Sequence, residues 1–289
     1  AKHAAQWLAT IETYANPVIG ALAVDKVELS HIVTILEKDG LWEAKTETAT
    51  RLRQRIEAVL TWATVRGYRK GDNPARWKGH LDAVLPKPSK VAKVEHHRAL
   101  PVSGMFSFMT DLRKRPGIAA RCLDFVILTA VRSGEARGAT WGEIDLDAAV
   151  WTVPADRMKA HKEHRVPLSA DAVALLKDLP RMQGSDYVFP AARGGRLSDM
   201  ALTAVMRRME VDAVPHGFRS AFRDWCAEHT NYPHEVAEMA LAHTISSAVE
   251  RAYRRGDLFE KRRNLMDDWA RFLRLPPAAG DVVPLRAQA

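Results

Sequence analysis

Five side chains between residues 132 and 253 are of types that together could cleave a phosphodiester bond. Cleavage without a metal ion needs an oxygen nucleophile, cations that bind the non-bridging phosphate oxygens, and an acid that protonates the leaving 5′ oxygen. Tyrosine can supply the nucleophile, histidine can transfer a proton, and the five fixed N–H donors of arginine can reach two phosphate oxygens at once. The candidates are Arg132, His216, Arg219, His243 and Tyr253.

The surroundings of the first arginine allow a functional and a structural interpretation. Arg132 follows the apolar stretch Cys122–Val131 and precedes Ser133-Gly134, where a buried helix would open into a turn. A cation in that position could bind phosphate. It could equally form a structural ion pair with Glu135 or Glu143.

The histidines and the tyrosine are ambiguous for similar reasons. His216 and Arg219 stand three residues apart at the start of a predicted helix, whose unpaired N–H groups attract anions. The alternative is a histidine that caps the helix and a surface arginine. His243 lies ten residues before Tyr253, and a tyrosine by itself is usually an amphipathic packing residue. Each position considered alone therefore decides nothing.

The elements that must position these residues begin with a small helical unit. Apolar residues at helical spacing predict helices over Lys2–Tyr14, Asp25–Lys38, Glu43–Val65 and Pro74–Val84. The next segment, residues 86–97, has two prolines, three lysines and no apolar periodicity. This composition predicts an extended linker that can lie along a phosphate backbone. We therefore expect domains at residues 1–85 and 98–275, a linker at 86–97 and a flexible tail at 276–289.

The second domain is predicted to mix helices with a small antiparallel sheet. Strand signals at Val150–Val153 and Arg165–Leu168 flank a basic loop, which indicates a hairpin. The fold class that follows is mainly α with a small antiparallel β-sheet. Helices are expected at Val102–Lys114, Ile118–Val131, Ala170–Arg181, Ser198–Met209, Phe218–His229, His234–Leu241, Ser247–Tyr253 and Leu258–Leu273.

Composition restricts the partners and the location. The 43 Lys and Arg exceed the 35 Asp and Glu, which gives a net charge of +8 and favours a polyanionic partner such as nucleic acid. Two cysteines are too few for a disulfide framework, and both are expected in the core. No apolar run approaches the roughly 18 residues that cross a bilayer, and the first residues lack the layout of a secretory signal. We expect a cytoplasmic protein without membrane contacts.

Taken in order, the candidate residues resemble the signature of the tyrosine recombinase family. Thr129–Glu135 resembles the family's first arginine motif, and Trp141–Leu146 resembles the stretch that follows it. Arg157-Met158-Lys159 with His164–Ser169 looks like the hairpin of the phage P4-type integrases, and Trp62–Pro74 is similar to the core-binding domain of that subgroup. The resemblance covers about residues 1 to 275.

The resemblance implies that Tyr253 attacks the scissile phosphate and leaves a 3′-phosphotyrosine with a free 5′-hydroxyl, without metal, cofactor or ATP. Lys159 would protonate the departing 5′ oxygen. Lys162 lies three residues away, but only Lys159 follows a methionine as in the family's hairpin. His161 and His164 in the same loop could suggest a metal site. No cysteine or carboxylate set stands at ligand spacing, so we expect none.

The resemblance assigns the other residues around the phosphate. Arg132 and Arg219 would hold the non-bridging oxygens, and Glu135 would orient Arg132. His216 would act as acid and base near the tyrosine, and His243 would donate a further hydrogen bond to the phosphate. The sequence departs from the family at two positions where glycine is common, which bears on the local backbone more than on the chemistry. These positions are Ala130 and Ala242.

The expected activity is that of a site-specific DNA recombinase, an integrase of a mobile element such as a prophage or genomic island. The resemblance implies a two-domain, C-shaped clamp around double-stranded DNA at an attachment site, four copies on paired sites, and accessory DNA-bending or excision factors, in the bacterial cytoplasm at the nucleoid. Such integrases usually carry an N-terminal arm-binding domain that nothing here resembles, so a longer protein is expected. The side chains expected to contact DNA are Arg66, Arg69, Lys70, Lys87, Lys90, Lys93 and Lys162.

Two other functions remain open at this point. Type IB topoisomerases use a similar set of residues to form the same covalent bond, although the hairpin and the helical unit favour recombination. A DNA-binding regulator that kept the clamp but lost the chemistry is the second alternative, against which the complete residue set argues.

Overall fold

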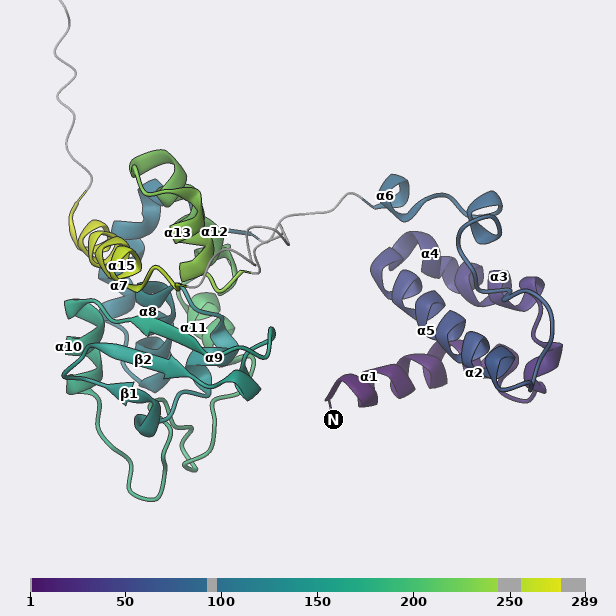
Figure 1. Ribbon diagram of the computed structural model, residues 1–289, viewed down its shortest axis with the longest axis horizontal. Helices are drawn as coiled ribbons and strands as arrows, with labels where there is room; N and C mark the ends of the chain where they lie inside the picture. Colours follow the sequence, from purple (N-terminus) through teal and green to yellow (C-terminus); the bar gives the residue numbers. More distant parts are fainter. Residues whose placement is uncertain (1, 93–97, 244–255, 277–289) are drawn as a thin grey trace, which may run out of the picture. The chain divides into compact units, whose positions relative to one another are not determined.

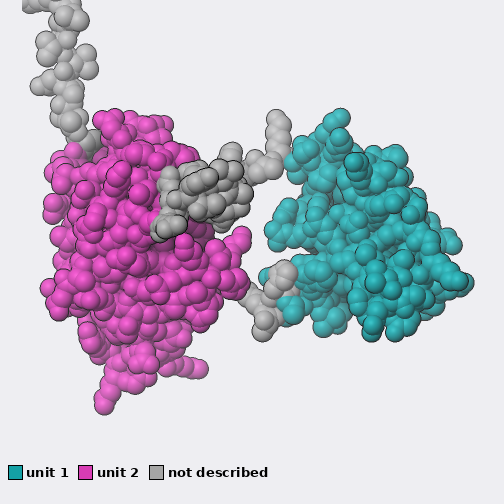
Figure 2. Space-filling view, in the orientation of Figure 1, with its two compact units in different colours: residues 1–96 teal, residues 97–289 magenta. Residues whose placement is uncertain are grey.

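The computed structural model describes residues 2–92, 98–243 and 256–276 (Figure 1). The chain divides into two compact units, residues 1–96 and 97–289, which Figure 2 shows in different colours. We refer to them as unit 1 and unit 2. Both Tyr253 and the helix expected over Ser247–Tyr253 lie outside the described residues. The finer division expected from the sequence, with a separate linker and tail, stays a prediction.

Unit 1 is helical. Its longest helix, α5, buries Leu52, Ile56 and Leu60 on one face against Ile32 and Leu36 of α3, so an amphipathic stripe at helical spacing produces the core. A π-helical segment, Ile11–Ala15, joins α1 to α2, so the first helix extends beyond its predicted end. The helices are α1 (Lys2–Thr10), α2 (Asn16–Ile19), α3 (Leu29–Glu37), α4 (Leu41–Ala44), α5 (Thr46–Val65) and α6 (Pro88–Val91).

Three predictions for unit 1 are wrong in detail. The helix expected over Glu43–Val65 is divided at Lys45, whose backbone leaves the helical region (φ −137°, ψ 51°). The helix expected over Asp25–Lys38 is divided into a 3-10 turn, Val24–Lys26, and the helix α3, which begins only at Leu29. The stretch expected to be an extended linker contains the short helix α6, with Pro88 in its first turn.

The prediction of a helix over Pro74–Val84 is also wrong. This segment consists of turns and one 3-10 turn, Leu81–Ala83. Asn73 ties its start to α5 by donating to the Glu57 carbonyl at 2.8 Å, and Gly79 adopts a left-handed φ of 71° that ends any helix. Ala75 and Leu81 are fully buried all the same. The apolar spacing therefore predicted correctly that these residues are buried, but it was wrong to predict a helix.

Unit 2 contains the helices predicted for its described residues, with shifted ends, and one short helix, α9, that was not predicted. It packs these helices with a three-stranded sheet. The helices are α7 (Met105–Arg113), α8 (Ile118–Thr129), α9 (Ser133–Arg137), α10 (Ala170–Asp178), α11 (Ala201–Arg208), α12 (Gly217–His229), α13 (His234–Ala240) and α15 (Phe259–Arg274). None of the described helices is long and apolar enough to span a bilayer.

The sheet is antiparallel in the order β1-β2-β3, which confirms the predicted fold class and the predicted hairpin. β2 (Val150–Val153) pairs with β3 (His164–Pro167), with Val153 opposite His164. The extra edge strand, β1 (Ile144–Asp145), was not predicted because two residues are too short to show alternation. The register matters for the site, since it fixes His164 at the first residue of β3.

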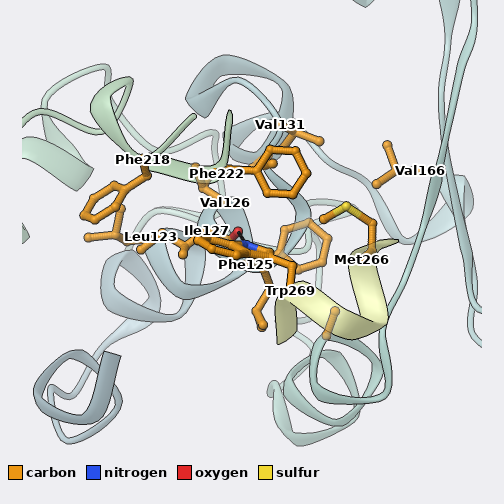
Figure 3. Close-up of a cluster of buried hydrophobic side chains, with 14 of the residues drawn as sticks. Leu123, Phe125, Val126, Ile127, Val131, Val166, Phe218, Phe222, Met266 and Trp269 are labelled. Carbon is orange, nitrogen blue, oxygen red and sulfur yellow. Dashed lines mark hydrogen bonds between the residues drawn. The ribbon is translucent and has the colours of Figure 1, made fainter. Parts of the chain in front are cut away.

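The core of unit 2 surrounds α8, whose residues from Cys122 to Thr129 are all buried. Trp269 of α15 packs edge-on against Phe222 of α12 and donates its indole N–H to the carbonyl of Ile127 at 2.8 Å (Figure 3). Both cysteines are buried here, as predicted. Burial on this scale contributes roughly 1.5–3 kcal/mol for each large apolar side chain. It gives α8, α12 and α15 a fixed arrangement, and the ends of α8 and α12 carry the candidate site.

Candidate active site

Arg132 stands where α8 ends and α9 begins. Its guanidinium donates to Glu135 Oε1 at 2.9 Å, and its backbone N–H donates to Glu135 Oε2 at 2.9 Å. The carboxylate is 5% exposed, whereas the Arg132 side chain remains 29% exposed. The buried acid thus holds one edge of the guanidinium while another part faces solvent. The other structural partner considered for Arg132, Glu143, instead accepts a hydrogen bond from Trp151 and pairs with Arg157.

Arg219, in the first turn of α12, is a buried cation with 4% of its surface exposed. It donates to the Ala130 carbonyl at 2.5 Å and to the Leu241 carbonyl at 2.6 Å, which are the C-cap residues of α8 and α13. Helix C-termini carry partial negative charge, so both contacts favour the cation. Burial, followed by the charge of Arg132, lowers the pKa of Arg219 to about 10, so it stays charged at neutral pH.

His243 follows α13 and lies against Arg219, with 3.1 Å between Arg219 Nη2 and His243 Nε2. Its other nitrogen, Nδ1, is 2.8 Å from Glu238 Oε2. Arg132 Nη2 lies 3.4 Å from the carbonyl of Ala242, the residue before His243. Three of the predicted site residues, Arg132, Arg219 and His243, are therefore brought together from three separate segments of the chain.

His216 is the N-cap residue of α12 and is exposed. Gly217, which follows it, permits a close backbone approach: a Cβ at this position would collide with the carbonyl oxygen of Arg98 and lie 2.8 Å from Ala99 Cα. A glycine is therefore required at the start of α12. The close packing fixes the entry of the helix and with it the direction in which Arg219 points.

The two candidate lysines lie in the loop between β2 and β3. Lys159 and Lys162 are both exposed. The neighbouring Met158 is only 4% exposed and anchors the start of the loop. Arg157 reinforces the anchor by donating to Glu143 and to the Glu135 carbonyl. The loop is thus held at its base, and the two lysines are equally accessible in the described structure.

The expected DNA-contacting residues of unit 1 differ in accessibility. Arg69 is 7% exposed, and its guanidinium donates to the Asp72 carbonyl at 3.0 Å, so it supports the turn after α5. Lys93 lies outside the described residues, as Tyr253 does. The exposed members of the set in unit 1 are Arg66, Lys70, Lys87 and Lys90.

Three further residues belong to this neighbourhood and were not predicted. Glu238 accepts hydrogen bonds from His243 and from Arg223 Nε, the latter at 2.7 Å. His164, at the start of β3, has a buried Nε2 without a hydrogen-bond partner among the described residues. Burial, then the charge of Arg262, lowers the pKa of His164 to about 4, and Arg132 and Arg219 contribute in the same direction. Glu238 and His243 are only five residues apart, but neither that spacing nor the contact of Glu238 with Arg223 matches a motif that marked these residues in the sequence. In the described part of the chain, no three His, Cys, Asp or Glu side chains gather as metal ligands would.

Both alanines that replace the family's common glycines have left-handed backbones. Ala130 has a φ of 51° and Ala242 a φ of 49°. A left-handed conformation costs an L-residue roughly 1–2 kcal/mol, and replacement by glycine removes that strain at some cost in chain entropy. We expect Ala130→Gly and Ala242→Gly each to raise the free energy of unfolding of the protein, by about 0.5 kcal/mol. Urea unfolding of each variant measures this.

A matched control for these variants is Ala136→Gly, a buried alanine inside helix α9, where glycine should destabilise. Equal destabilisation by all three glycines would show that neither left-handed alanine is strained.

Comparisons with known proteins relate both units of the chain to integrases. The model of the phage integrase central domain matches residues 1–80, and that of the phage integrase family matches residues 106–258. The integrase of Enterobacteria phage P4 is 28% identical over 293 residues, which cover 94% of this chain but 65% of that protein. The chain therefore spans less than two thirds of the length of this relative.

Two solved structures share the fold. A lambda integrase(75-356) dimer bound to a COC′ core site superposes with a TM-score of 0.63 at 16% identity, covering 89% of each chain. A lambda integrase tetramer bound to a Holliday junction also gives a TM-score of 0.63 at 16% identity, covering 86% of this chain and 71% of that one.

Proposed function

Because this chain belongs to the phage integrase family, we propose that it is the core-binding and catalytic part of a site-specific tyrosine recombinase, which cleaves and rejoins DNA through a 3′-phosphotyrosine at Tyr253. The observation that carries the proposal is the convergence of Arg132, Arg219 and His243 within hydrogen-bonding distance of one another or of adjacent backbone. Two guanidinium groups and an imidazole in one place form a site for a phosphate anion.

In this proposal the two arginines hold the non-bridging oxygens as negative charge develops. Arg132 is the accessible cation, and Glu135 holds its guanidinium from behind. Arg219 is fixed by two carbonyls and therefore needs little reorganisation when the phosphate arrives. Donors that are already oriented stabilise a developing charge better than donors that must turn toward it. His243 contributes a further hydrogen bond from the same side.

The Tyr253 oxygen attacks phosphorus and gives up its proton to His216, while the P–O5′ bond breaks and Lys159 donates a proton to the leaving 5′ oxygen. The bond energy is retained in the phosphotyrosine, so a 5′-hydroxyl can reverse the reaction without metal, cofactor or ATP. We assign the proton donor to Lys159 rather than Lys162 because it follows the buried anchor Met158 directly.

We further propose that unit 1 binds duplex DNA through its exposed basic residues and that residues 1–85 act as a core-binding domain. The net charge of +8 of the whole chain fits a partner whose phosphates are neutralised by Lys and Arg. The solved tetramer of lambda integrase on a Holliday junction supports four copies acting on paired attachment sites. A cytoplasmic location follows from the DNA substrate.

The experiment that tests this function is covalent trapping. The protein is incubated, in EDTA, with nicked suicide duplexes built from the DNA junctions that flank its own coding element, and adducts are resolved on a denaturing gel. We expect an adduct that maps to the Tyr253 peptide and disappears in Tyr253→Phe. Tyr187→Phe, a half-buried tyrosine of unit 2, is the matched control and should retain the adduct.

Tight binding to a junction without an adduct would favour a regulator that has lost the chemistry. An adduct that persists in Tyr253→Phe would assign the nucleophile to another residue.

A further inference from the structure

Glu238 of α13 makes the contacts that determine how His243 is held. Its two carboxylate oxygens are used separately: Oε2 lies 2.8 Å from His243 Nδ1, and Oε1 accepts from Arg223 Nε at 2.7 Å. Arg223 lies one turn after Arg219 on α12, so one helix face presents both guanidinium groups. Glu238 is 25% exposed and His243 is 41% exposed. The imidazole is therefore contacted at both nitrogens, by α12 on one side and α13 on the other.

These partners specify where the proton of His243 resides. An ionised carboxylate only accepts hydrogen bonds, and a guanidinium only donates them. Nδ1 must therefore carry the hydrogen that Glu238 accepts, and Nε2 must present its lone pair to Arg219 Nη2 at 3.1 Å. Partial burial alone would raise the pKa of Glu238, but the hydrogen bonds and charges of His243 and Arg223 outweigh it and lower that pKa. The carboxylate is thus ionised at neutral pH.

We propose that Glu238 is a positioning residue, which fixes His243 as the Nδ1–H tautomer and directs Nε2 toward the phosphate that Arg219 holds. The proposal rests on the proposed function of the site. A phosphate oxygen accepts hydrogen bonds only, so Nε2 can donate to it only after it has taken up a proton from solvent, to which His243 is 41% exposed. Glu238 retains the Nδ1 proton and faces the resulting imidazolium with a negative charge. Without Glu238, the ring loses both its orientation and this stabilisation.

A structural alternative makes a different prediction. Glu238 also ties α13 to α12 through Arg223, so its removal could act through helix packing alone. Arg223→Ala removes that tie but leaves the contact between Glu238 and His243. The two variants therefore separate a positioning role from a packing role.

The first measurement is a nitrogen-15 histidine spectrum of the full chain without DNA, in which the His243 signals are assigned by their loss in His243→Asn. In the wild type and in Arg223→Ala, we expect Nδ1 to be protonated and Nε2 to be unprotonated. In Glu238→Ala, we expect the ring to lose its orientation and move away from Arg219, so that the Nε2–H form favoured by a free histidine becomes the major neutral tautomer. An unchanged His243 spectrum in folded Glu238→Ala would overturn the proposal.

The second measurement is single-turnover cleavage of the suicide duplex at saturating protein, so that binding does not limit the rate. We expect Glu238→Ala to cleave about 10- to 100-fold more slowly, as when a partner that orients a functional histidine is lost, and Arg223→Ala to stay within about threefold of the wild type. Equal rates for wild type and Glu238→Ala, or equal losses in the two variants, would refute the positioning role. If the wild type forms no adduct, the proposed function fails, whereas the tautomer measurement still decides whether Glu238 sets the state of His243.

Discussion

Replacing Arg219 with lysine is expected to slow single-turnover cleavage of the suicide duplex by about 10²- to 10³-fold, the loss typical for removal of one preorganised donor to a developing oxyanion. Lysine cannot reproduce the contacts, because the guanidinium reaches the Ala130 and Leu241 carbonyls and His243 with separate N–H groups in one plane. A single ammonium group on a flexible stem would satisfy some of these and lose the fixed direction.

Burial adds a second reason for the loss. The surroundings that lower the pKa of Arg219 to about 10 act on any cation at this position. A lysine has an ordinary pKa of about 10.4, so the same surroundings would bring its pKa closer to neutral pH. A larger fraction of the lysine would then be uncharged, and its attraction for phosphate would be weaker.

The control for Arg219→Lys is Arg271→Lys, an exposed arginine of α15 that pairs with Asp268, where we expect no change in rate. Circular dichroism and thermal unfolding establish that both variants are folded before rates are compared. A folded Arg219→Lys protein that cleaves at the wild-type rate would remove Arg219 from the proposed phosphate site.

The second large effect concerns stability at mildly acidic pH. His164 has a folded-state pKa of about 4, well below its ordinary value of 6.5, because its half-buried ring is largely removed from water and lies near Arg262, Arg132 and Arg219. The unfolded chain therefore binds a proton here before the folded protein does. Stability from this residue is fully present above pH 6.5 and is lost progressively as the pH falls toward 4. Between pH 7 and pH 5 the loss is about 2 kcal/mol.

Urea unfolding at pH 7 and pH 5 measures this loss. In His164→Asn, whose side chain does not titrate, the difference in unfolding free energy between the two pH values should shrink by about 2 kcal/mol relative to the wild type. His161→Asn is the matched control: His161 is exposed in the same loop, and asparagine tolerates its left-handed φ of 51°. The explanation fails if His164→Asn and His161→Asn change the pH difference equally.

Much of the fold could be predicted because burial leaves a periodic pattern in the sequence. α8 follows from a run of apolar residues, α12 from apolar residues at helical spacing, and β2 and β3 from strand signals on either side of a basic loop. The prediction failed where backbone geometry overrode the pattern. Gly79 turns a helically spaced segment into successive turns, and Lys45 divides one predicted helix into two.

The candidate site was predictable only in part. Arg132, Arg219 and His243 stood in a recognisable order, and the structure brings them together. The roles of Glu238 and His164 were not predicted. Glu238 joins His243, five residues away, to Arg223 of α12, and the surroundings of His164 depend on how β3 packs. The left-handed conformations of Ala130 and Ala242 were indicated only by the glycines common at these positions in the family, since alanine itself rarely adopts them.

Hydrogen bonds link the three segments that carry Arg132, Arg219 and His243 to one another. Arg219 is held by the carbonyl of Ala130, two residues before Arg132, while Arg132 reaches the carbonyl of Ala242, beside His243. Arg219 and Arg132 thus each depend on backbone beside another site residue, and His243 contacts the side chain of Arg219. Residues in such contact show strong energetic coupling, so the effects of paired substitutions should depart from additivity. We therefore expect exposed basic residues such as Lys70 or Lys87 to be replaced independently, whereas Arg132, Arg219 and His243 should be kept or changed together.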